Sequence, residues 1–242
     1  MKKFYPVIHC YDFNQTQYNL LLALKNKADG VFLINHNQMS ELTFDLIIDT
    51  ISAAYKDQIK IGANFLNLSN TEALEKAVNF GLDMLWVDNA GCDDCDNLQS
   101  AENFFKRSYE LDDEMNVEIF GGVHFKYQPK PRSSIFESIT QSLIYMDIPT
   151  LSGSATGNPA DIEFIKEAHY ALDAFNKSYW PEKGDRSLAI ASGVSIENVN
   201  DYLPYIDHFL VASSILDEND ERLFDEEKLK MLCERIHLYE TK

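Results

Sequence analysis

The strongest constraint on the fold is the regular alternation of two kinds of segment along the chain. Short apolar runs rich in β-branched residues recur, and each is followed by a longer amphipathic segment. The runs are mostly continuous rather than alternating, as strands buried on both faces are, and such repeats are typical of parallel β/α folds. Eight strands are predicted, at residues 5–9, 30–34, 60–66, 84–88, 117–125, 148–152, 188–192 and 208–212.

The longer segments carry the start signals of helices. Ser69 before the third segment and Ser195 before the seventh place cap oxygens near free helical N–H groups, and Pro159 suits a first helical turn. Eight helices are predicted, near residues 15–27, 39–56, 71–80, 99–110, 133–146, 159–174, 196–203 and 225–238.

The length fits one closed barrel. The 242 residues match the roughly 250 of a (β/α)8 barrel that folds as one unit. No linker rich in Pro, Gly or Ser divides the chain, and 45% hydrophobic residues suffice for a sizeable core. We therefore expect a single-domain (β/α)8 TIM barrel over residues 1–242. In that fold the carboxyl ends of the strands share one mouth, where active sites lie.

The excess of acidic residues narrows the range of binding partners. The chain has 39 acidic and 21 basic residues, and its formal net charge of -18 repels nucleic acids and anionic membranes. The N-terminal apolar run is too short for a signal-peptide core or a membrane span, and four cysteines are too few for a disulfide scaffold. The sequence predicts a cytoplasmic protein with reduced thiols, no nucleic acid partner and no membrane span. Its acidic charge and aromatic residues are compatible with a homodimer.

Two segments in the C-terminal part of the chain favour phosphate binding. Ser192 and Gly193 follow the seventh predicted strand, and Ser213 and Ser214 follow the eighth. Barrels of this class commonly hold phosphate between these loops through main-chain N–H groups, hydroxyls and a helix N-terminus. Gly193 would let an anion approach closely, and Ser195 would cap the helix. The alternative is a tight turn whose serines satisfy nearby backbone groups.

A second glycine-rich segment follows the sixth predicted strand. It reads Ser-Gly-Ser-Ala-Thr-Gly from residue 152 and lacks the Gly-Lys-Ser/Thr ending of a Walker loop. Its main-chain donors could wrap an anion or a ribose hydroxyl, which makes Ser152, Gly153, Ser154 and Thr156 candidate ligand-binding residues. The alternative is a plain strand-to-helix connection.

Asp88, His124 and Lys126 are the best candidates for acid–base chemistry. They end the fourth and fifth predicted strands. Strand alternation puts His124 and Lys126 on one face and turns Val123 and Phe125 toward the helices. An imidazole near a carboxylate can transfer protons, and an ammonium can stabilise developing negative charge. The alternative is a satisfied buried ion pair.

Three further polar residues lie at the ends of the first three predicted strands. His9 is a candidate for catalysis or ligand binding, the alternative being a hydrogen bond to a neighbour. Asn35 and Asn64 are candidate ligand-binding residues at the same mouth.

Cys92 and Cys95 form a Cys-x-x-Cys pair after the fourth predicted strand. Such a pair is half of a zinc site, which Cys10 or a mouth histidine could complete. A second pair at regular spacing is missing, and the flanking aspartates would raise the thiol pKa values, which argues against a redox pair. We expect an acidic exposed loop and no cofactor, with zinc as the alternative.

Five segments, spread over the chain, resemble those of a known family in their residues and in their order along the chain. They are Ala28-Asp-Gly-Val, Ile61-Gly-Ala-Asn-Phe-Leu, Leu151-Ser-Gly-Ser-Ala-Thr-Gly-Asn-Pro-Ala-Asp, Ala191-Ser-Gly-Val-Ser-Ile-Glu-Asn-Val and Leu210-Val-Ala-Ser-Ser. In these segments the chain resembles the BtpA/SgcQ family of (β/α)8 proteins, named for a photosystem I biogenesis factor. The resemblance implies a phosphate-binding type of barrel and, through related barrels, a phosphorylated sugar or nucleotide-like ligand.

The chain departs from the family pattern at charged positions. Ile34 stands where the family has an acidic residue, Trp86 replaces an arginine, and the strand-five pattern Asp-Val-x-x-Lys-His becomes Gly-Val-His-Phe-Lys-Tyr. The residues that still match the family are Lys126, Asn35, Asn64 and His9.

Two functions from different classes follow. The first is an enzyme, an isomerase, lyase or hydrolase, that binds a small phosphorylated molecule of ribosyl or nucleotide-like type. Asp88 or His124 would transfer a proton, and Lys126 would stabilise charge. The alternative is a non-catalytic, BtpA-like assembly or ligand-sensing barrel, which the departures favour. A polar pocket at the mouth would support the enzyme, and a mouth filled by aromatic residues would support the scaffold.

Overall fold

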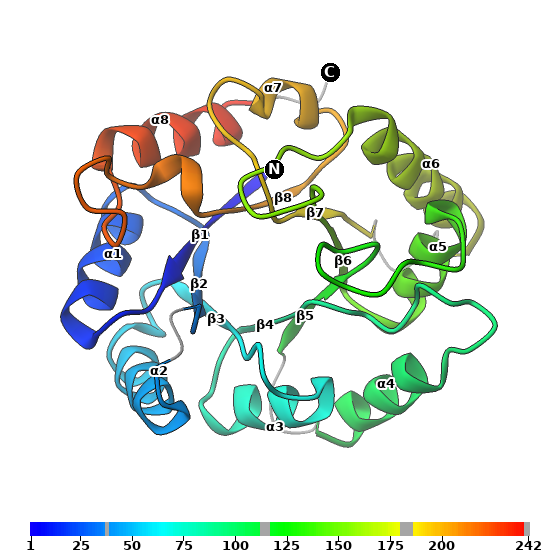
Figure 1. Cartoon of the computed structure of the whole chain (residues 1–242), viewed down its shortest axis with the longest axis horizontal. Coiled ribbons are helices and arrows are strands. Elements are labelled where there is room, and N and C mark those ends of the chain that lie inside the picture. The colour runs from blue at the N-terminus through cyan, green and yellow to red at the C-terminus, as the bar shows by residue number, and fades with distance from the viewer. Residues whose placement is uncertain (37–38, 112–116, 180–185, 240–242) are drawn as a thin grey trace.

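Eight parallel strands close into a barrel that eight α-helices surround, within the described residues 1–36, 39–111, 117–179 and 186–239 of the computed structural model (Figure 1). Each strand pairs with its sequence neighbours, and β8 closes the ring against β1. The predicted fold class is confirmed. The strands are β1 (Lys3–His9), β2 (Gly30–Ile34), β3 (Lys60–Asn64), β4 (Met84–Val87), β5 (Glu118–Gly122), β6 (Ile148–Leu151), β7 (Ala189–Ile190) and β8 (His208–Val211).

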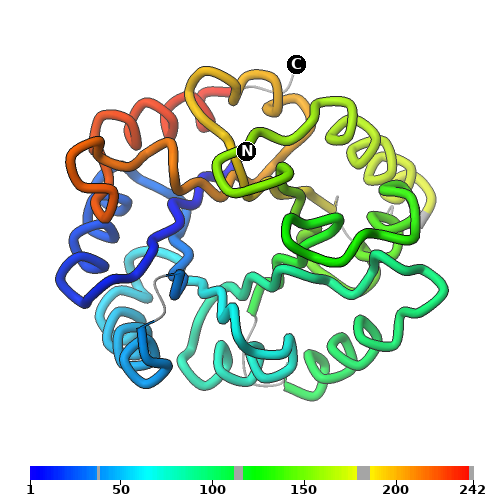
Figure 2. The backbone as a smooth tube through the Cα atoms, viewed as in Figure 1, coloured from blue at the N-terminus to red at the C-terminus, as the bar shows by residue number. Residues whose placement is uncertain are grey.

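The helices form the outer ring, and the tube trace shows a helix on the outside between successive strands (Figure 2). Ser69 and Glu72 form a capping box at the start of α3, as the sequence predicts, and Ser134 and Glu137 form another at α5. The helices are α1 (Phe13–Lys25), α2 (Glu41–Tyr55), α3 (Asn70–Asn79), α4 (Gln99–Leu111), α5 (Ile135–Tyr145), α6 (Ile162–Tyr179), α7 (Val199–Tyr202) and α8 (Glu226–His237).

Several expected boundaries differ from the structure, and two of them differ for local reasons. The fifth strand ends at Gly122 rather than at residue 125, because His124 has a φ of 46° and turns the chain out of the extended conformation. The predicted cap at Ser195 is wrong, because α7 begins at Val199 with Asn198 at its N-cap position. The Ser195 N–H donates to Oδ1 of Asn198 at 2.8 Å in the turn before this four-residue helix.

Two apolar layers hold the barrel together. The outer layer packs the helices against the strands, and the inner layer fills the barrel. Inside, the ring of Tyr5 makes edge-to-face contacts with Phe32 and Phe120, with centroids 5.9 and 5.7 Å apart. Trp86 and Phe125 continue this stack toward the mouth. The barrel is therefore plugged with aromatic rings. No helix in the described ranges is long and apolar enough to cross a bilayer.

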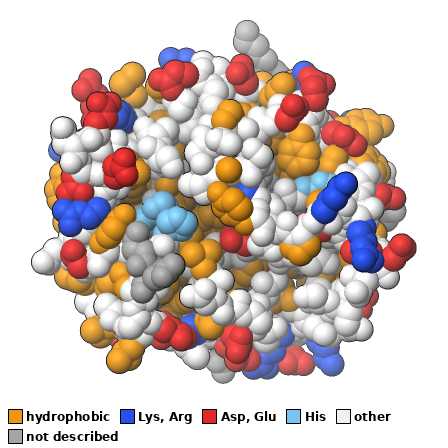
Figure 3. Space-filling view, in the orientation of Figure 1, with side chains coloured by type: hydrophobic (Ala, Val, Ile, Leu, Met, Phe, Trp, Pro, Cys, Tyr) orange, Lys and Arg blue, Asp and Glu red, His pale blue; other side chains and the backbone are white. Residues whose placement is uncertain are grey.

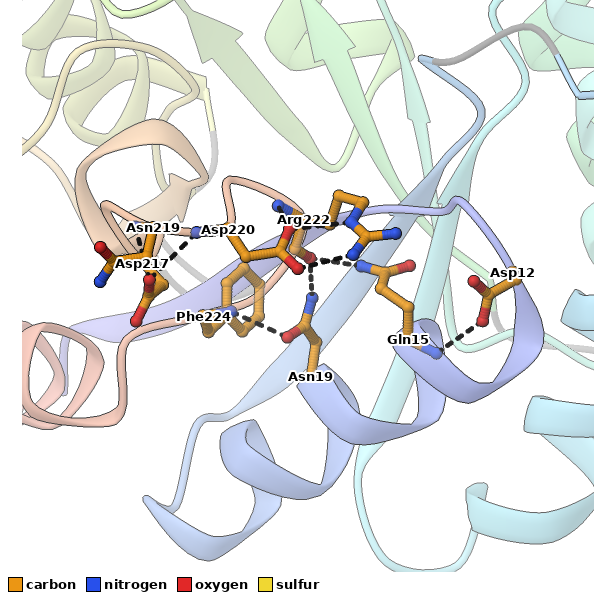
Figure 4. A network of polar contacts seen from close by, with 8 residues as sticks. All are labelled: Asp12, Gln15, Asn19, Asp217, Asn219, Asp220, Arg222 and Phe224. Atoms are coloured by element: carbon orange, nitrogen blue, oxygen red, sulfur yellow. Dashed lines mark hydrogen bonds and ion pairs between the residues drawn. The ribbon is translucent and has the colours of Figure 1, made fainter.

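Buried amides on α1 tie together the loops that follow β1 and β8 (Figure 4). Nε2 of Gln15 donates to the carbonyls of His9 and Arg222, at 3.1 and 2.6 Å. Asn19 donates to the same Arg222 carbonyl at 2.9 Å and accepts the N–H of Phe224 at 2.9 Å. The first and last strands thus present their carboxyl ends in a fixed relation.

The opposite end of the barrel carries an ion pair that joins α8 to the turn before β2. His237 Nε2 lies 2.7 Å from Oδ2 of Asp29, and Sγ of Cys233 lies 3.6 Å from His237 Nδ1. The hydrogen bond to Asp29, and then the one to Cys233, raise the pKa of His237 to about 10. Asp29 also accepts the N–H of Phe4 at 2.8 Å. The pair therefore joins the last helix to the first strand.

Replacing this histidine should destabilise the protein in a pH-dependent way. The folded pKa lies above the unfolded value of 6.5. The ion pair is therefore fully stabilising below about pH 6.5, and its contribution is lost as the pH rises through the folded pKa. We expect His237→Gln to lower the free energy of unfolding by roughly 1–3 kcal/mol at about pH 6 in urea titrations. A difference that persists unchanged at about pH 10.5 would contradict this account. His169→Gln on α6, whose carboxylate contact is 3.7 Å long, is the matched control.

Candidate active site

A cavity of about 490 Å³ opens at the carboxyl ends of the strands. Every strand contributes to its wall, either through its own end or through the loop that follows it. The first, second, fourth and eighth strands contribute residues of the strand itself, and the third, fifth, sixth and seventh contribute only through their loops. Figure 3 looks onto this end, where hydrophobic and histidine side chains gather near the centre. The mouth is therefore hollowed above the aromatic plug rather than closed by it.

The loops that follow β6 and β7 are locked together on one side of the cavity. Oγ of Ser192 donates to the carbonyls of Ala155 and Asn158, at 2.9 and 3.3 Å. Gly193 has a φ of 61°, and a Cβ there would stand 2.2 Å from the Asn158 carbonyl. Gly153 meets the same carbonyl, with a distance of 2.1 Å for a Cβ. Only glycine fits either position.

The next contact joins the loops that follow β7 and β8. Oγ of Ser214 donates to the Val194 carbonyl at 2.6 Å. The main-chain N–H groups of Gly193, Val194, Ser213 and Ser214 have no acceptor within the described part of the chain. All four residues line the cavity. Since the hydroxyl hydrogens of Ser192 and Ser214 are already donated to carbonyls, these N–H groups remain as donors for an anion, together with the Ser213 hydroxyl, which has no partner among the described residues.

The glycine-rich loop after β6 contributes less than the sequence indicates. Of the four candidates, only Thr156 lines the cavity. Ser152 is buried, accepts the N–H of Lys126 at 2.8 Å and donates to the Gly153 carbonyl at 3.0 Å. Ser154 is exposed and accepts from Asn158 at 3.3 Å. This loop mainly supports its neighbours.

Asp88 and Lys126 stand inside the cavity with opposite pKa shifts. Burial raises the pKa of Asp88, although Asn64, which donates to its Oδ1 at 2.8 Å, and the charge of Lys126 both lower it. Burial lowers the pKa of Lys126, and the Asp88 charge opposes that shift. The Lys126 ammonium also donates to the Ala191 carbonyl at 3.3 Å. It therefore lies next to the loop that carries Ser192.

His9 also faces the cavity, and its ring centroid lies 5.0 Å from that of His36. Burial, followed by the nearby His36 and Lys126, lowers the pKa of His9 to about 4. A neutral imidazole at neutral pH can accept a proton, and burial makes the Asp88 carboxylate a stronger base than an exposed one. Both groups are thus suited to proton transfer.

His124 does not reach the cavity, and the strand alternation expected for this segment is wrong. Its left-handed backbone turns the ring outward, where Nε2 lies 3.1 Å from Oγ of Ser138 on α5 and the ring stacks on Phe164. Phe125, expected to face the helices, instead joins the inner layer and lines the cavity. Ser138 is fully buried, so this pair offers no accessible nucleophile.

Two more predicted residues have structural partners. Asn35 closes a turn through both main-chain groups of Met39, at 2.9 and 3.0 Å, and does not line the cavity. Cys92 is buried, and the Sγ of Cys95 contacts the Cys92 carbonyl at 3.8 Å. Among the described residues, no group of three or more His, Cys, Asp or Glu side chains is placed to hold a metal ion.

The sequence reasoning missed Ile34 and Leu66, which form much of the apolar wall of the cavity. Ile34, Leu66 and Trp86 line the side formed by β2 to β4. A usable signal exists, because Ile34 and Trp86 each stand two residues before a polar mouth residue, His36 and Asp88, and so share its face of the strand. Trp86 therefore gives this wall of the cavity an aromatic surface.

The fold and the mouth cavity define a (β/α)8 barrel protein, and solved structures match it along nearly the whole chain. The phosphoribosyl anthranilate isomerase of Thermus thermophilus has a TM-score of 0.64 and 13% identity, over 97% of this chain and 98% of that one. An isomerase of the same name, in complex with reduced 1-(o-carboxyphenylamino)-1-deoxyribulose 5-phosphate, has a TM-score of 0.60 and 15% identity, over 98% and 99%. A native KDPGal structure has a TM-score of 0.64 and 12% identity, over 96% and 94%.

No protein-family model matches the sequence, and no curated protein sequence matches it. At identities of 12–15%, the likeness to solved structures shows the fold alone.

Removing the amide that supports Asp88 should raise the pKa of this carboxyl further. Asn64→Leu deletes a hydrogen bond to the charged form, so we expect an upward shift of about one unit, measured by NMR titration of the 13C-labelled carboxyl. Asn26→Leu, at the other end of the barrel, should leave the Asp88 titration unchanged. A downward shift in the Asn64 variant would show that the hydrogen bond does not stabilise the carboxylate.

Proposed function

We propose that the protein is an enzyme acting on a small phosphorylated metabolite of ribosyl or nucleotide-like type at the mouth of the barrel. The observation that carries the proposal is the set of four unpaired main-chain N–H groups, at Gly193, Val194, Ser213 and Ser214, which border the cavity from two adjoining loops. Converging N–H donors form a site for phosphate oxygens, and these two loops are where such barrels bind phosphate.

The likeness to solved structures agrees with this proposal. Two of them are phosphoribosyl anthranilate isomerases, and one holds a phosphorylated sugar derivative. Identities this low make the parallel an analogy of fold, so the proposal depends on the N–H donors and the polar groups of the cavity.

We assign the chemistry to three side chains that face the cavity. His9, neutral because its pKa is lowered to about 4, would accept a proton from the substrate. Asp88, a buried carboxyl whose pKa is raised, would transfer a second proton. The Lys126 ammonium would stabilise negative charge that develops on a substrate oxygen. His124 has no part in this scheme, because its ring lies against α5 and α6.

The second candidate is a BtpA-like barrel that assists assembly or senses a ligand without catalysis. Trp86 and Ile34 favour it, since apolar side chains line the wall where the BtpA/SgcQ pattern carries charge. The membership of that family is part of this second proposal.

We also propose a cytoplasmic location and a homodimer. All four cysteines are free thiols, as in reducing compartments. Leu42 and Leu46, one turn apart on α2, are 80% and 65% exposed, so they offer an apolar face for a second copy. Light scattering after size-exclusion chromatography would give twice the mass of 27.7 kDa for a dimer, and 27.7 kDa would contradict it.

A carboxylate placed among the N–H donors should prevent phosphate binding. We expect Ser213→Asp to weaken the binding of inorganic phosphate and ribose 5-phosphate by about tenfold or more in isothermal titration calorimetry, because like charges repel at short range. Ser100→Asp adds the same charge on α4 and should bind as the wild type does. Equal affinity in the two variants would place the phosphate elsewhere.

An acid–base enzyme should exchange substrate hydrogen with solvent. We expect the wild type, incubated in D2O with a panel of sugar phosphates, to incorporate deuterium into at least one, as detected by mass spectrometry. Lys126→Met should slow the exchange by about a hundredfold or more, because charge stabilisation is lost. Phosphate binding without exchange of any compound would favour the ligand-sensing alternative.

A further inference from the structure

Lys126 presents a half-buried amine inside the cavity. Its side chain lines the cavity together with the apolar side chains of Trp86, Phe125 and Val194. The Phe125 ring centroid lies 5.5 Å from Nζ. Lys130, four residues further along the same loop, is exposed. This loop therefore carries one lysine that is partly withdrawn from water and one that is fully hydrated.

The amino group of Lys126 has few partners for its hydrogens. An ammonium carries three donor hydrogens, and those left unpaired in a site of low polarity cost free energy. Among the described residues, Nζ donates to the Ala191 carbonyl at 3.3 Å and forms no ion pair with a carboxylate. Burial accordingly lowers the pKa of Lys126, although the charge of Asp88 opposes the shift. The neutral, nucleophilic form of this amine is thus more populated than on an exposed lysine.

The amine also stands beside the proposed phosphate site. Ala191, whose carbonyl accepts from Nζ, comes two residues before Gly193, the first of the four N–H donors. Two residues of backbone span at most about 7 Å. A compound whose phosphate binds there therefore needs only a few carbon atoms to bring a second functional group to Nζ.

Two groups that can transfer protons share the cavity with the amine. His9 and Asp88 both line it, and the charge of Lys126 acts on the pKa of each. The attack of an amine on a carbonyl requires such groups, because protons must move between nitrogen and oxygen during the reaction. The cavity thus combines a nucleophile, proton-transfer groups and an anion site.

From this arrangement we infer that Lys126 forms a Schiff base with the substrate, and that the substrate is a small phosphorylated aldehyde or ketone. The inference rests on the proposed function, because the phosphate site brings the carbonyl group to Nζ. It also narrows that function. The cation that stabilises developing negative charge is then an iminium bonded to the substrate, in place of the free ammonium.

The steps balance without a co-reactant. The lone pair of Nζ attacks the carbonyl carbon, the C=O π electrons move to oxygen, and a proton passes from nitrogen to that oxygen, which gives a carbinolamine. Its hydroxyl takes a second proton through Asp88 and leaves as water, while the nitrogen lone pair forms the C=N bond of the iminium. His9 would then accept a proton from the neighbouring carbon. Hydrolysis of the iminium returns the free lysine, so the class of reaction is an isomerisation or a carbon–carbon cleavage.

Reductive trapping tests the inference directly. The probes are glyceraldehyde 3-phosphate, dihydroxyacetone phosphate, ribose 5-phosphate and ribulose 5-phosphate, each added to the full chain with sodium cyanoborohydride. Reduction fixes the iminium as a secondary amine, so the intact mass rises by the mass of the probe less one oxygen atom. With at least one probe, peptide mapping should show Lys126 labelled about tenfold or more above Lys130. Inorganic phosphate should suppress the labelling of Lys126 and leave that of Lys130 unchanged.

An arginine variant separates the iminium from a simple positive charge. Lys126→Arg keeps the charge but cannot form an imine. We expect it to lose trapping and to slow deuterium exchange by about a hundredfold or more, as Lys126→Met does. Lys130→Met is the matched control and should keep both activities. Calorimetry with inorganic phosphate shows that each variant retains a folded cavity. Exchange near the wild-type rate in Lys126→Arg would overturn the inference.

The other outcomes distinguish the inference from the proposed function. If the probes bind but none labels Lys126 above Lys130, the inference is overturned, while the phosphate site and the role of the ammonium stand. If inorganic phosphate fails to suppress the labelling of Lys126, the carbonyl does not arrive through the phosphate site, and the inferred substrate class is wrong. If neither phosphate nor any probe binds, the proposed function fails together with the inference.

Discussion

The mouth of this barrel depends on the close approach of the Asn158 backbone to two glycines. Gly153 and Gly193 come from different loops, yet a Cβ on either would stand 2.1–2.2 Å from the Asn158 carbonyl. Because glycine has no side chain, the loop after β6 can lie directly on the loop after β7. Ser192 fixes that contact by donating to Ala155 and Asn158.

This interlocking decides which groups remain for a ligand. Ser192 and Ser214 donate their hydroxyl hydrogens to loop carbonyls, so the backbone supplies most of the donors around the proposed phosphate site. Main-chain donors on a rigid frame cost little conformational entropy when an anion binds. The buried amides of Gln15 and Asn19 extend the same rigidity to the loop after β8, by holding the carbonyl of Arg222.

The aromatic plug sets the depth and the polarity of the cavity. Tyr5, Phe32 and Phe120 fill the barrel below, and Trp86 forms part of the wall above them. The low polarity of this surrounding is the reason that burial dominates the pKa shifts of His9 and Asp88, in opposite directions for the base and the acid. The apolar wall and the shifted pKa values thus share one cause.

Periodicity and cap signals predict the barrel because strand, helix and turn preferences agree over most of the chain. They predict β2 to the residue and the helix cap at Ser69. They fail at His124, where a left-handed non-glycine residue breaks the alternation and sends Phe125 inward in place of the histidine. No sequence pattern specifies such a backbone, since the contacts that enforce it, such as Asp93 Oδ1 with the His124 N–H, are long-range.

The sequence predicted which loops line the candidate site, but not which atoms of those loops are free to bind a ligand. Ser192, Gly193, Ser213 and Ser214 do line the cavity. Which of their groups are free depends on partners from other loops, such as the Val194 carbonyl that occupies the Ser214 hydroxyl. Single-sequence reasoning has no access to those pairings, so it could not tell which of the main-chain N–H groups and hydroxyls in these loops stay free for a ligand.

The most direct test of the account is an NMR titration of the 15N-labelled protein with inorganic phosphate. The account predicts that the amide signals of four residues shift with one common dissociation constant and by more than any other amide signals. These residues are Gly193, Val194, Ser213 and Ser214. Shifts that are largest at another place, or none at phosphate concentrations of about 10 mM, would contradict the assignment of these two loops as a phosphate site.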